Sequence, residues 1–290
     1  MIEYQIKDWT KTTFSYRNTS LSRMLLRILP LPSLTAILMV YAHQWVLDLH
    51  LPVIVHTILG TALGLLLVFR NNASYDRFWE GRKKWGGIVN DSRNLARSSY
   101  AYGNNLPAMV PLICSFCHAL KNQLRSADTQ TIDQAITPFL TVEQREKLLK
   151  HHNVSWMISI EMSKVLQQSI KDQNLTVEQG QRIETLIASL IDHQGACERI
   201  LKTPVPFTYT VHVRQLLMIY LITLPLILIP MMGWLSVLGI TIIGFGLLGI
   251  EEAGLEIEDP FGDDPNDLPL DAICDTICRD VQLHAELINT

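Results

Sequence analysis

Charged residues are scarce in this sequence, and their scarcity excludes several classes of protein. Only 18% of the 290 residues are charged, whereas 48% are hydrophobic, a balance too apolar for an ordinary soluble domain. The formal net charge of −4 offers no basic surface of the kind that binds nucleic acid. P-loop, G-x-S-x-G and H-E-x-x-H motifs are absent, so hydrolase and nucleotide-driven functions have no support. An apolar membrane part joined to a water-facing part is the natural interpretation.

Cysteines are also few, and their number is odd. The five are Cys114, Cys117, Cys197, Cys274 and Cys278. Such a scattered set does not form the framework of a disulfide-rich domain. Cys114 and Cys117 make a C-x-x-C motif inside an apolar, helix-like run, and no second pair stands at zinc-binding spacing. Core packing is the favoured interpretation of this motif, and a metal or redox role is the alternative.

Three long runs free of charge predict membrane spans. Residues 28–47 and 49–69 are each about the length of one transmembrane helix. The third run, residues 215–250, would form a helix of about 54 Å, too long for a single span. Pro230-Met231-Met232-Gly233 offers a turn near its middle, so we expect a helical hairpin whose first helix begins near Tyr209. The sequence thus predicts four spans.

Basic residues orient these spans. Seven of them directly follow the second span, namely Arg70, Arg77, Arg82, Lys83, Lys84, Arg93 and Arg97. Lysine and arginine are absent between the first two spans, so both termini and the middle segment are predicted to be cytoplasmic. We also expect no cleaved signal peptide. The predicted organisation is a cytoplasmic segment (1–27), two spans (28–69), a cytosolic helical domain (70–208), two spans (209–250) and an acidic segment with a C-terminal helix (251–290).

The middle segment carries two helix-start signals of identical sequence. LTVEQ occurs at residues 140–144 and 175–179, and each copy places glutamine three residues after threonine, as in a capping box. The second helix is predicted to end near Lys202, before Thr203-Pro204. The second span, by contrast, meets no proline or linker after Phe69. We therefore expect one continuous helix to leave the membrane and enter the cytosolic domain.

One face of the second span contains Thr61, Leu65 and Phe69, which are four residues apart. Spacing alone favours a face packed against lipid or other helices over a pore lining. Gly60 and Gly64 form a G-x-x-x-G motif, which permits close helix approach but is common in membrane helices.

An acidic stretch follows the last span. Nine carboxylates lie between Glu251 and Asp271 without a lysine or arginine among them. They lack EF-hand spacing. Residues 263–267, DDPND, match the D-D-x-x-D pattern by which prenyl-transferring membrane enzymes hold magnesium diphosphate, and Asp271 with Asp275 could supply a second pair. The alternative is a structural segment that docks on the basic residues 77–84.

Three motifs together resemble the bestrophin family of ion channels, in particular its bacterial members. They are FRNNASYDRFWEGRKKWG, ACERILKTPVPFTY and EDPFGDDPNDLPLDAIC. The resemblance implies an all-α membrane protein with four transmembrane helices and a cytosolic helical bundle. It also implies a homopentamer around a central pore, since a ring of identical copies can enclose what one subunit cannot.

The resemblance also assigns sites. It places the pore neck at Thr61, Leu65 and Phe69, and the lower, cytosolic constriction at Glu178. The acidic stretch matches the calcium clasp of animal members at Glu256, Asp259, Asp264 and Asp267. The first two depart from the amides of the animal pattern, so no cofactor is expected to be required, although a divalent cation could bind there.

The function implied is a channel that passes small monovalent ions through a hydrophobic neck, with anions, chloride above all, as the family default. A cation channel for sodium is the main alternative, because five glutamates at position 178 would favour cations. A secondary transporter and a prenyl-transferring enzyme that uses the DDPND carboxylates are more distant alternatives. The expected partners are the other subunits, the permeant ions and the lipid bilayer, with no nucleic acid. The expected location is the inner (plasma) membrane, crossed several times.

Overall fold

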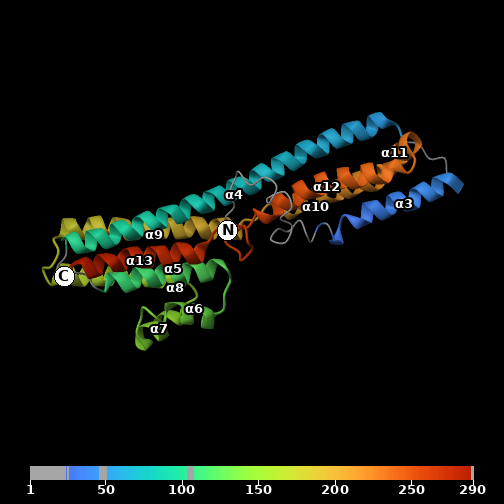
Figure 1. Ribbon diagram of the computed structural model, residues 1–290. Helices are drawn as coiled ribbons and strands as arrows, with labels where there is room; N and C mark the ends of the chain where they lie inside the picture. Colours follow the sequence, from blue (N-terminus) through green and yellow to red (C-terminus); the bar gives the residue numbers. More distant parts are fainter. Residues whose placement is uncertain (1–23, 25, 46–50, 103–107, 289–290) are drawn as a thin grey trace. The chain divides into compact units, whose positions relative to one another are not determined.

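The computed structural model describes residues 24, 26–45, 51–102 and 108–288, and these residues form helices joined by turns. No strand occurs among them, so the all-α prediction is confirmed for this part of the chain. The predicted N-terminal segment, residues 1–27, lies almost entirely outside the described residues. The helices are α3 (Pro30–Trp45), α4 (Val53–Tyr102), α5 (Met109–Leu124), α6 (Thr129–Ile136), α7 (Val142–Leu149), α8 (Val154–Lys171), α9 (Val177–Lys202), α10 (Phe207–Thr223), α11 (Pro225–Met232), α12 (Leu235–Glu256) and α13 (Leu270–Ile288) (Figure 1).

The chain divides into two compact units. The first unit comprises Met1–Phe78, Pro204–Asp259 and Asp264–Asp267, and the second comprises Trp79–Thr203, Pro260–Asp263 and Leu268–Thr290. The division falls inside α4, which runs 50 residues without a break. The predicted continuity of the second span with the following charged helix is therefore confirmed. The membrane boundary itself, at Phe69, stays a prediction.

The first unit is a bundle of apolar helices. Its core consists of leucines and one valine from α4, α10 and α12, packed with Met24 and Leu29. Three helical segments of the described residues are long and apolar enough to cross a membrane: α4, α10 together with α11, and α12. The remaining predicted span, residues 28–47, corresponds to α3, which is 16 residues long; residues 28 and 29 form a turn before it, and residues 46–47 lie outside the described ranges.

The hairpin between α11 and α12 confirms the predicted turn but corrects its position. Pro230 lies inside α11, and the chain reverses at Gly233 and Trp234. Gly233 has φ +54° and ψ −128°, a conformation that costs a glycine little and other residues much. The first half of the hairpin is also interrupted at Leu224, because Pro225 has no N–H to donate to the preceding turn, although Leu224 itself keeps helical backbone angles.

The second unit is a helical bundle in which α5 packs against α8 and α13, and α8 packs against α9 (Figure 1). Both predicted capping boxes are confirmed. The Thr141 and Thr176 hydroxyls accept from the amides of Gln144 and Gln179, whose side chains accept in return from the threonine amides. Helix α9 ends at Lys202, as predicted. Its core face contains Ile183, Ile187 and Leu190, all buried.

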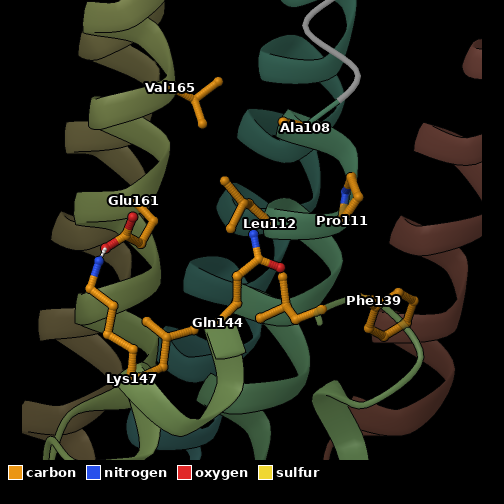
Figure 2. Close-up of a pocket in the computed structure, with 10 residues that line it drawn as sticks. Ala108, Pro111, Leu112, Phe139, Gln144, Lys147, Glu161 and Val165 are labelled. Atoms are coloured by element: carbon orange, nitrogen blue, oxygen red, sulfur yellow. Dashed lines mark hydrogen bonds and ion pairs between the residues drawn. The ribbon is translucent and has the colours of Figure 1, made fainter. Parts of the chain in front are cut away.

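A cavity of about 160 Å³ lies within the second unit (Figure 2). Leu112, Leu140 and Val165 are among its apolar lining residues. On one side the Lys147 ammonium lies 2.9 Å from the Glu161 carboxylate, so the two charged groups neutralise each other. The cavity is smaller than the pockets that enclose drug-sized ligands, typically 300 Å³ or more.

Candidate functional site

The apolar part of α4 has one exposed side and one buried side. Thr61, Leu65 and Phe69 all lie on the exposed side, and the side chains of Leu65 and Phe69 are more than half exposed. The Thr61 hydroxyl donates to the carbonyl of Thr57, 2.8 Å away, so it is turned back towards the helix. Within the part of the chain that the structure describes, none of the three is buried against another helix, which argues against a face packed within the subunit.

The buried side of α4 fixes how the helix is turned. Leu63 and Leu67 are buried in the core of the first unit, and Leu66 packs against its margin. At Gly60, α4 lies close to the ring of Tyr220 on α10. A side chain with a Cβ at this position would place that atom 3.1 Å from the ring, so glycine permits the close packing of the two helices. A Cβ added at Gly64 would meet nothing within 4 Å among the described residues, so in that part of the chain Gly60 alone of the two glycines permits close packing.

Arg70 directly follows Phe69, yet it is fully buried in the first unit. Its guanidinium lies 2.5 Å from the Glu251 carboxylate and 3.7 Å from that of Glu258. Arg214 binds the same oxygen of Glu251, at 2.8 Å. Two arginines and two glutamates thus form a network without net charge. Sequence analysis counted Arg70 only as a basic residue that orients the span, because no local pattern reveals a partner 181 positions away.

The four predicted clasp residues all lie in the first unit, in and after the last turn of α12. Asp267 is buried, and its carboxylate accepts from the Asp264 amide at 2.7 Å. The Asn266 side chain donates to Glu256 at 2.6 Å. The segment is therefore closed by its own hydrogen bonds. Within the described ranges, no group of three or more Asp, Glu, His or Cys residues is arranged to hold a metal ion.

Asp267 should make stability depend on pH. Burial raises the pKa of Asp267 to about 6, with a smaller contribution from neighbouring carboxylates. In the unfolded chain its pKa is about 4. The folded protein therefore takes up a proton as the pH falls through about 6, and the destabilisation caused by the ionised group disappears between about pH 6 and 4.

We expect Asp267→Asn to lose this dependence. The wild type should gain thermal stability in detergent when the pH is lowered from about 7 to about 5, and the variant should gain less, by roughly 1 kcal/mol. Asp275→Asn is the control, because it removes a carboxylate from an exposed position of α13. Equal gains in the wild type and in Asp267→Asn would contradict the assignment of this pH dependence to Asp267.

Two further carboxylates of the acidic stretch, Asp263 and Asp271, bind basic residues in and directly after the last turn of α5, within the second unit. Arg125 lies 3.0 Å from Asp263 and 2.8 Å from Asp271, and Lys121 lies 2.6 Å from Asp271. Burial opposes ionisation of Asp271, but the hydrogen bonds from Lys121 and Arg125 prevail and lower its pKa to about 2. Sequence analysis proposed residues 77–84 as the basic partners and missed these two.

Glu178 lies in the first turn of α9, in the second unit, and is fully exposed. Hydrogen bonds from its own amide and from the Thr176 side chain lower the pKa of Glu178, so it is ionised at neutral pH.

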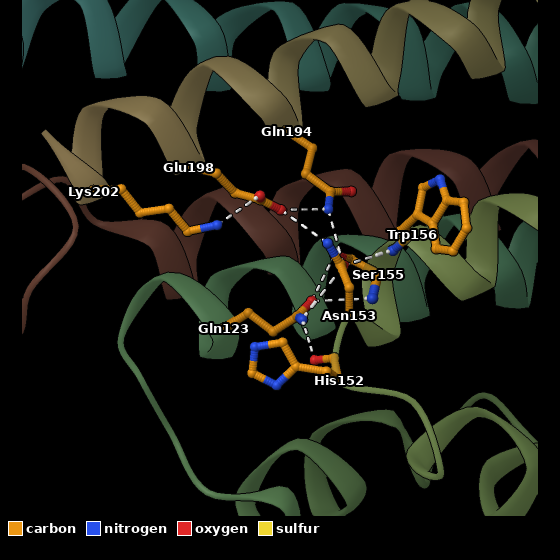
Figure 3. Close-up of polar contacts among 8 residues, drawn as sticks. All are labelled: Gln123, His152, Asn153, Ser155, Trp156, Gln194, Glu198 and Lys202. Carbon is orange, nitrogen blue, oxygen red and sulfur yellow. Dashed lines mark hydrogen bonds and ion pairs between the residues drawn. The ribbon is translucent and has the colours of Figure 1, made fainter.

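A polar network holds α9 against α8 and α5 (Figure 3). At its centre the Asn153 side chain accepts from Gln194 at 3.0 Å and donates to Glu198 at 3.0 Å. The helix that carries Glu178 is therefore fixed in the bundle.

Comparison with known proteins agrees with this architecture. Residues 1–283 match the model of the "Bacterial/Fungal Bestrophin protein" family. A voltage-dependent anion channel-forming protein of Nostoc sp. is 36% identical over 283 residues, which cover 95% of this chain and 91% of the relative. One of Synechocystis sp. is 38% identical over 242 residues, which cover 80% and 78%. The crystal structure of a bacterial bestrophin homologue from Klebsiella pneumoniae has 30% identity, a TM-score of 0.82, and coverage of 87% of this chain and 95% of that one.

Proposed function

The chain belongs to the family of bacterial and fungal bestrophin proteins, and on this premise we propose that it is a membrane channel for small monovalent ions, built as a homopentamer. The observation that carries the proposal is the exposed side of α4, where Thr61, Leu65 and Phe69 are exposed among the described residues while Leu63 and Leu67 are buried. Five such sides around an axis would form a neck with three stacked rings of side chains.

The proposed neck carries no charge. Arg70 directly follows Phe69 in the chain, but its side chain is buried in the first unit and paired with Glu251. Rings of apolar side chains make a hydrophobic constriction, which forces an ion to shed part of its hydration shell and can close by dewetting. The neck would therefore act as a barrier to all ions, without attracting either sign.

We propose that the channel passes anions, chloride above all, because its relatives in Nostoc and Synechocystis bear the name of anion channel-forming proteins. The alternative is a cation channel, which the exposed and ionised Glu178 favours if five copies surround the axis. Reversal potentials in planar bilayers between solutions of different salt concentration test the sign directly. A channel conducts without added substrate, whereas an enzyme produces no current.

Neutralising Glu178 distinguishes the roles that this residue can have. If the carboxylates line the lower constriction, Glu178→Gln should shift the reversal potential towards that of a more anion-selective channel, because a ring of negative charge is lost. Glu143→Gln is a matched control, since Glu143 occupies the same position of the first LTVEQ and is also exposed at the start of a helix. Equal reversal potentials in the wild type and in Glu178→Gln would place Glu178 outside the pore.

Oligomeric state provides an independent test. The mass of the purified protein in detergent, measured by light scattering or native mass spectrometry, should be five times that of the chain. A monomer or dimer would contradict the shared pore.

The proposed topology places the protein in the inner (plasma) membrane with both termini and the second unit in the cytoplasm, as the distribution of lysine and arginine predicts.

The prenyl-transferring alternative loses support from the carboxylates that it requires. Asp263 and Asp271 bind Arg125, so these groups are occupied by a cation of the protein itself. The relatives are named as channel-forming proteins, which supports a function without catalysis.

A divalent cation at Glu256, Asp259, Asp264 and Asp267 stays a proposal. Adding and removing calcium while recording the current would test it.

A further inference from the structure

The cavity in the second unit lies where α7 and the turn after α6 meet α5 and α8 (Figure 2). Most of its lining is apolar, and Leu112, Leu140 and Leu148 are buried side chains. Its volume of about 160 Å³ is close to that of an apolar cavity of about 150 Å³ that admits benzene. The cavity therefore has room for one small ring or one branched hydrocarbon chain.

One side of the cavity is polar, and its charges are unevenly paired. The ammonium groups of Lys147 and Lys164 both lie 2.9 Å from the same oxygen of Glu161, so two positive charges share one carboxylate. Burial opposes ionisation of Glu161, but the hydrogen bonds from Lys164 and Lys147 prevail and lower its pKa. Glu143, one turn before Lys147 on α7, is exposed and lies outside the lining. A second carboxylate beside Lys147 would give each ammonium a carboxylate of its own.

Gln144 supplies a second hydrogen-bond donor on this side. Its side chain extends from α7 towards Leu112 of α5 (Figure 2). The Gln144 side-chain oxygen accepts from the Thr141 amide at 3.0 Å in the capping box, which fixes the orientation of the amide group. The side-chain nitrogen has no hydrogen-bond partner among the described residues. Because an ammonium and an amide nitrogen both donate, Lys147 and Gln144 together match the acceptor oxygens of a carboxylate.

We propose that this cavity binds a small monocarboxylate with an aromatic or branched apolar body. The apolar body fills the space lined by Leu112, Leu140 and Val165, where it is removed from water. The carboxylate lies at the polar side and accepts hydrogen bonds from the Lys147 ammonium and the Gln144 side-chain nitrogen. Glu161 then keeps Lys164 as its partner, so that every charge in the group is paired.

The excess of positive charge selects the charge of the ligand. A cation of the same shape meets the like charge of Lys147, and the Glu161 oxygen beside it already accepts from two lysines. A neutral molecule of the same shape gains the apolar contacts alone. Binding joins α7 to α5 and α8 within the second unit, so the inference does not depend on ion conduction.

Fluorine NMR of 4-fluorobenzoate, titrated with the full-length protein in detergent, measures the binding. Micelles without protein are the reference, because apolar rings also enter detergent. We expect a dissociation constant on the order of 1 mM, since a ligand of so few atoms makes few contacts. 4-Fluorobenzamide has the same shape without the charge and should bind about fivefold more weakly. Equal affinities for the two compounds, or no binding of 4-fluorobenzoate beyond that of the micelles, would overturn the proposal.

Substitutions test whether the ligand lies in this cavity. Lys147→Gln should remove the preference for 4-fluorobenzoate over 4-fluorobenzamide, and it should not disturb folding because the Lys147 side chain is 58% exposed. Lys150→Gln is the matched control, since Lys150 is an exposed lysine at the end of α7 that does not line the cavity. Val165→Phe should fill the cavity and abolish binding of both compounds. Undiminished binding to Val165→Phe protein that elutes normally in gel filtration would overturn the proposal, as would equal preferences in Lys147→Gln and Lys150→Gln.

Discussion

Leu65→Ala is expected to increase the current through the channel and to shorten its closed intervals. Leu65 is the middle residue of the exposed side of α4, between Thr61 and Phe69. The substitution removes three carbons per subunit from the proposed neck, so water remains in a wider constriction and the barrier to ions falls. We expect at least about a twofold increase in single-channel current, with the same ion selectivity because no charge changes. Phe69→Ala should act in the same direction, and Thr61→Ala should have a smaller effect.

Leu66→Ala is the control for this experiment. Residue 66 is turned about 100° away from residue 65 on a helix, and its side chain packs against the core of the first unit. Truncation should leave the current nearly unchanged and reduce stability by up to about 2 kcal/mol through lost packing. A channel opened by Leu66→Ala and not by Leu65→Ala would show that the neck had been assigned to the wrong side of α4.

Glu251→Gln is expected to produce the largest loss of stability among these substitutions. The change preserves the size of the side chain but removes the charge that neutralises Arg70, which is fully buried 2.5 Å away. The remaining carboxylate, Glu258, lies 3.7 Å from the guanidinium. Removing one partner of a buried ion pair costs roughly 3–5 kcal/mol, because an unpaired charge stays behind in a medium of low polarity.

Glu80→Gln provides a matched control with the same chemical change. Glu80 pairs with Arg199 at 2.8 Å, but this pair is open to solvent, with 40% of the Glu80 side chain and 64% of the Arg199 side chain exposed, so the loss should stay below about 1 kcal/mol. Thermal unfolding in detergent, followed by tryptophan fluorescence, measures both variants. Replacing Arg70 and Glu251 together by methionine should recover part of the loss, because no unpaired charge then remains between these two positions. Coincident melting curves for Glu251→Gln and Glu80→Gln would refute a strong buried pair.

Arg70 also links stability to the proposed function. It follows Phe69 directly in the chain, and its bond to Glu251 joins α4 to α12 within the first unit. At Gly254, an added Cβ would lie 2.1 Å from the Asn71 side-chain oxygen, so close approach of the two helices continues on this side. These contacts fix the rotation of α4, and the rotation decides which residues are presented on the exposed side.

Sequence alone determined those features that depend on neighbours along the chain. The two capping boxes at Thr141 and Thr176 were predictable because threonine and the glutamine three residues later satisfy each other locally. The unbroken α4 followed from the absence of helix-breaking residues. The hairpin turn was predicted within three residues of Gly233, the residue that adopts the positive φ angle. Membership of the bestrophin family also followed from the three motifs.

Tertiary structure alone decided which distant residues meet. It paired Arg70 with Glu251 and brought Arg125 to Asp263 and Asp271. No local rule predicts such pairs, because their members are separated by more than a hundred residues and meet only when helices pack in one particular rotation. Helical period shows that Thr61, Leu65 and Phe69 share a side, but only packing of the opposite side against other helices decides that this side is exposed.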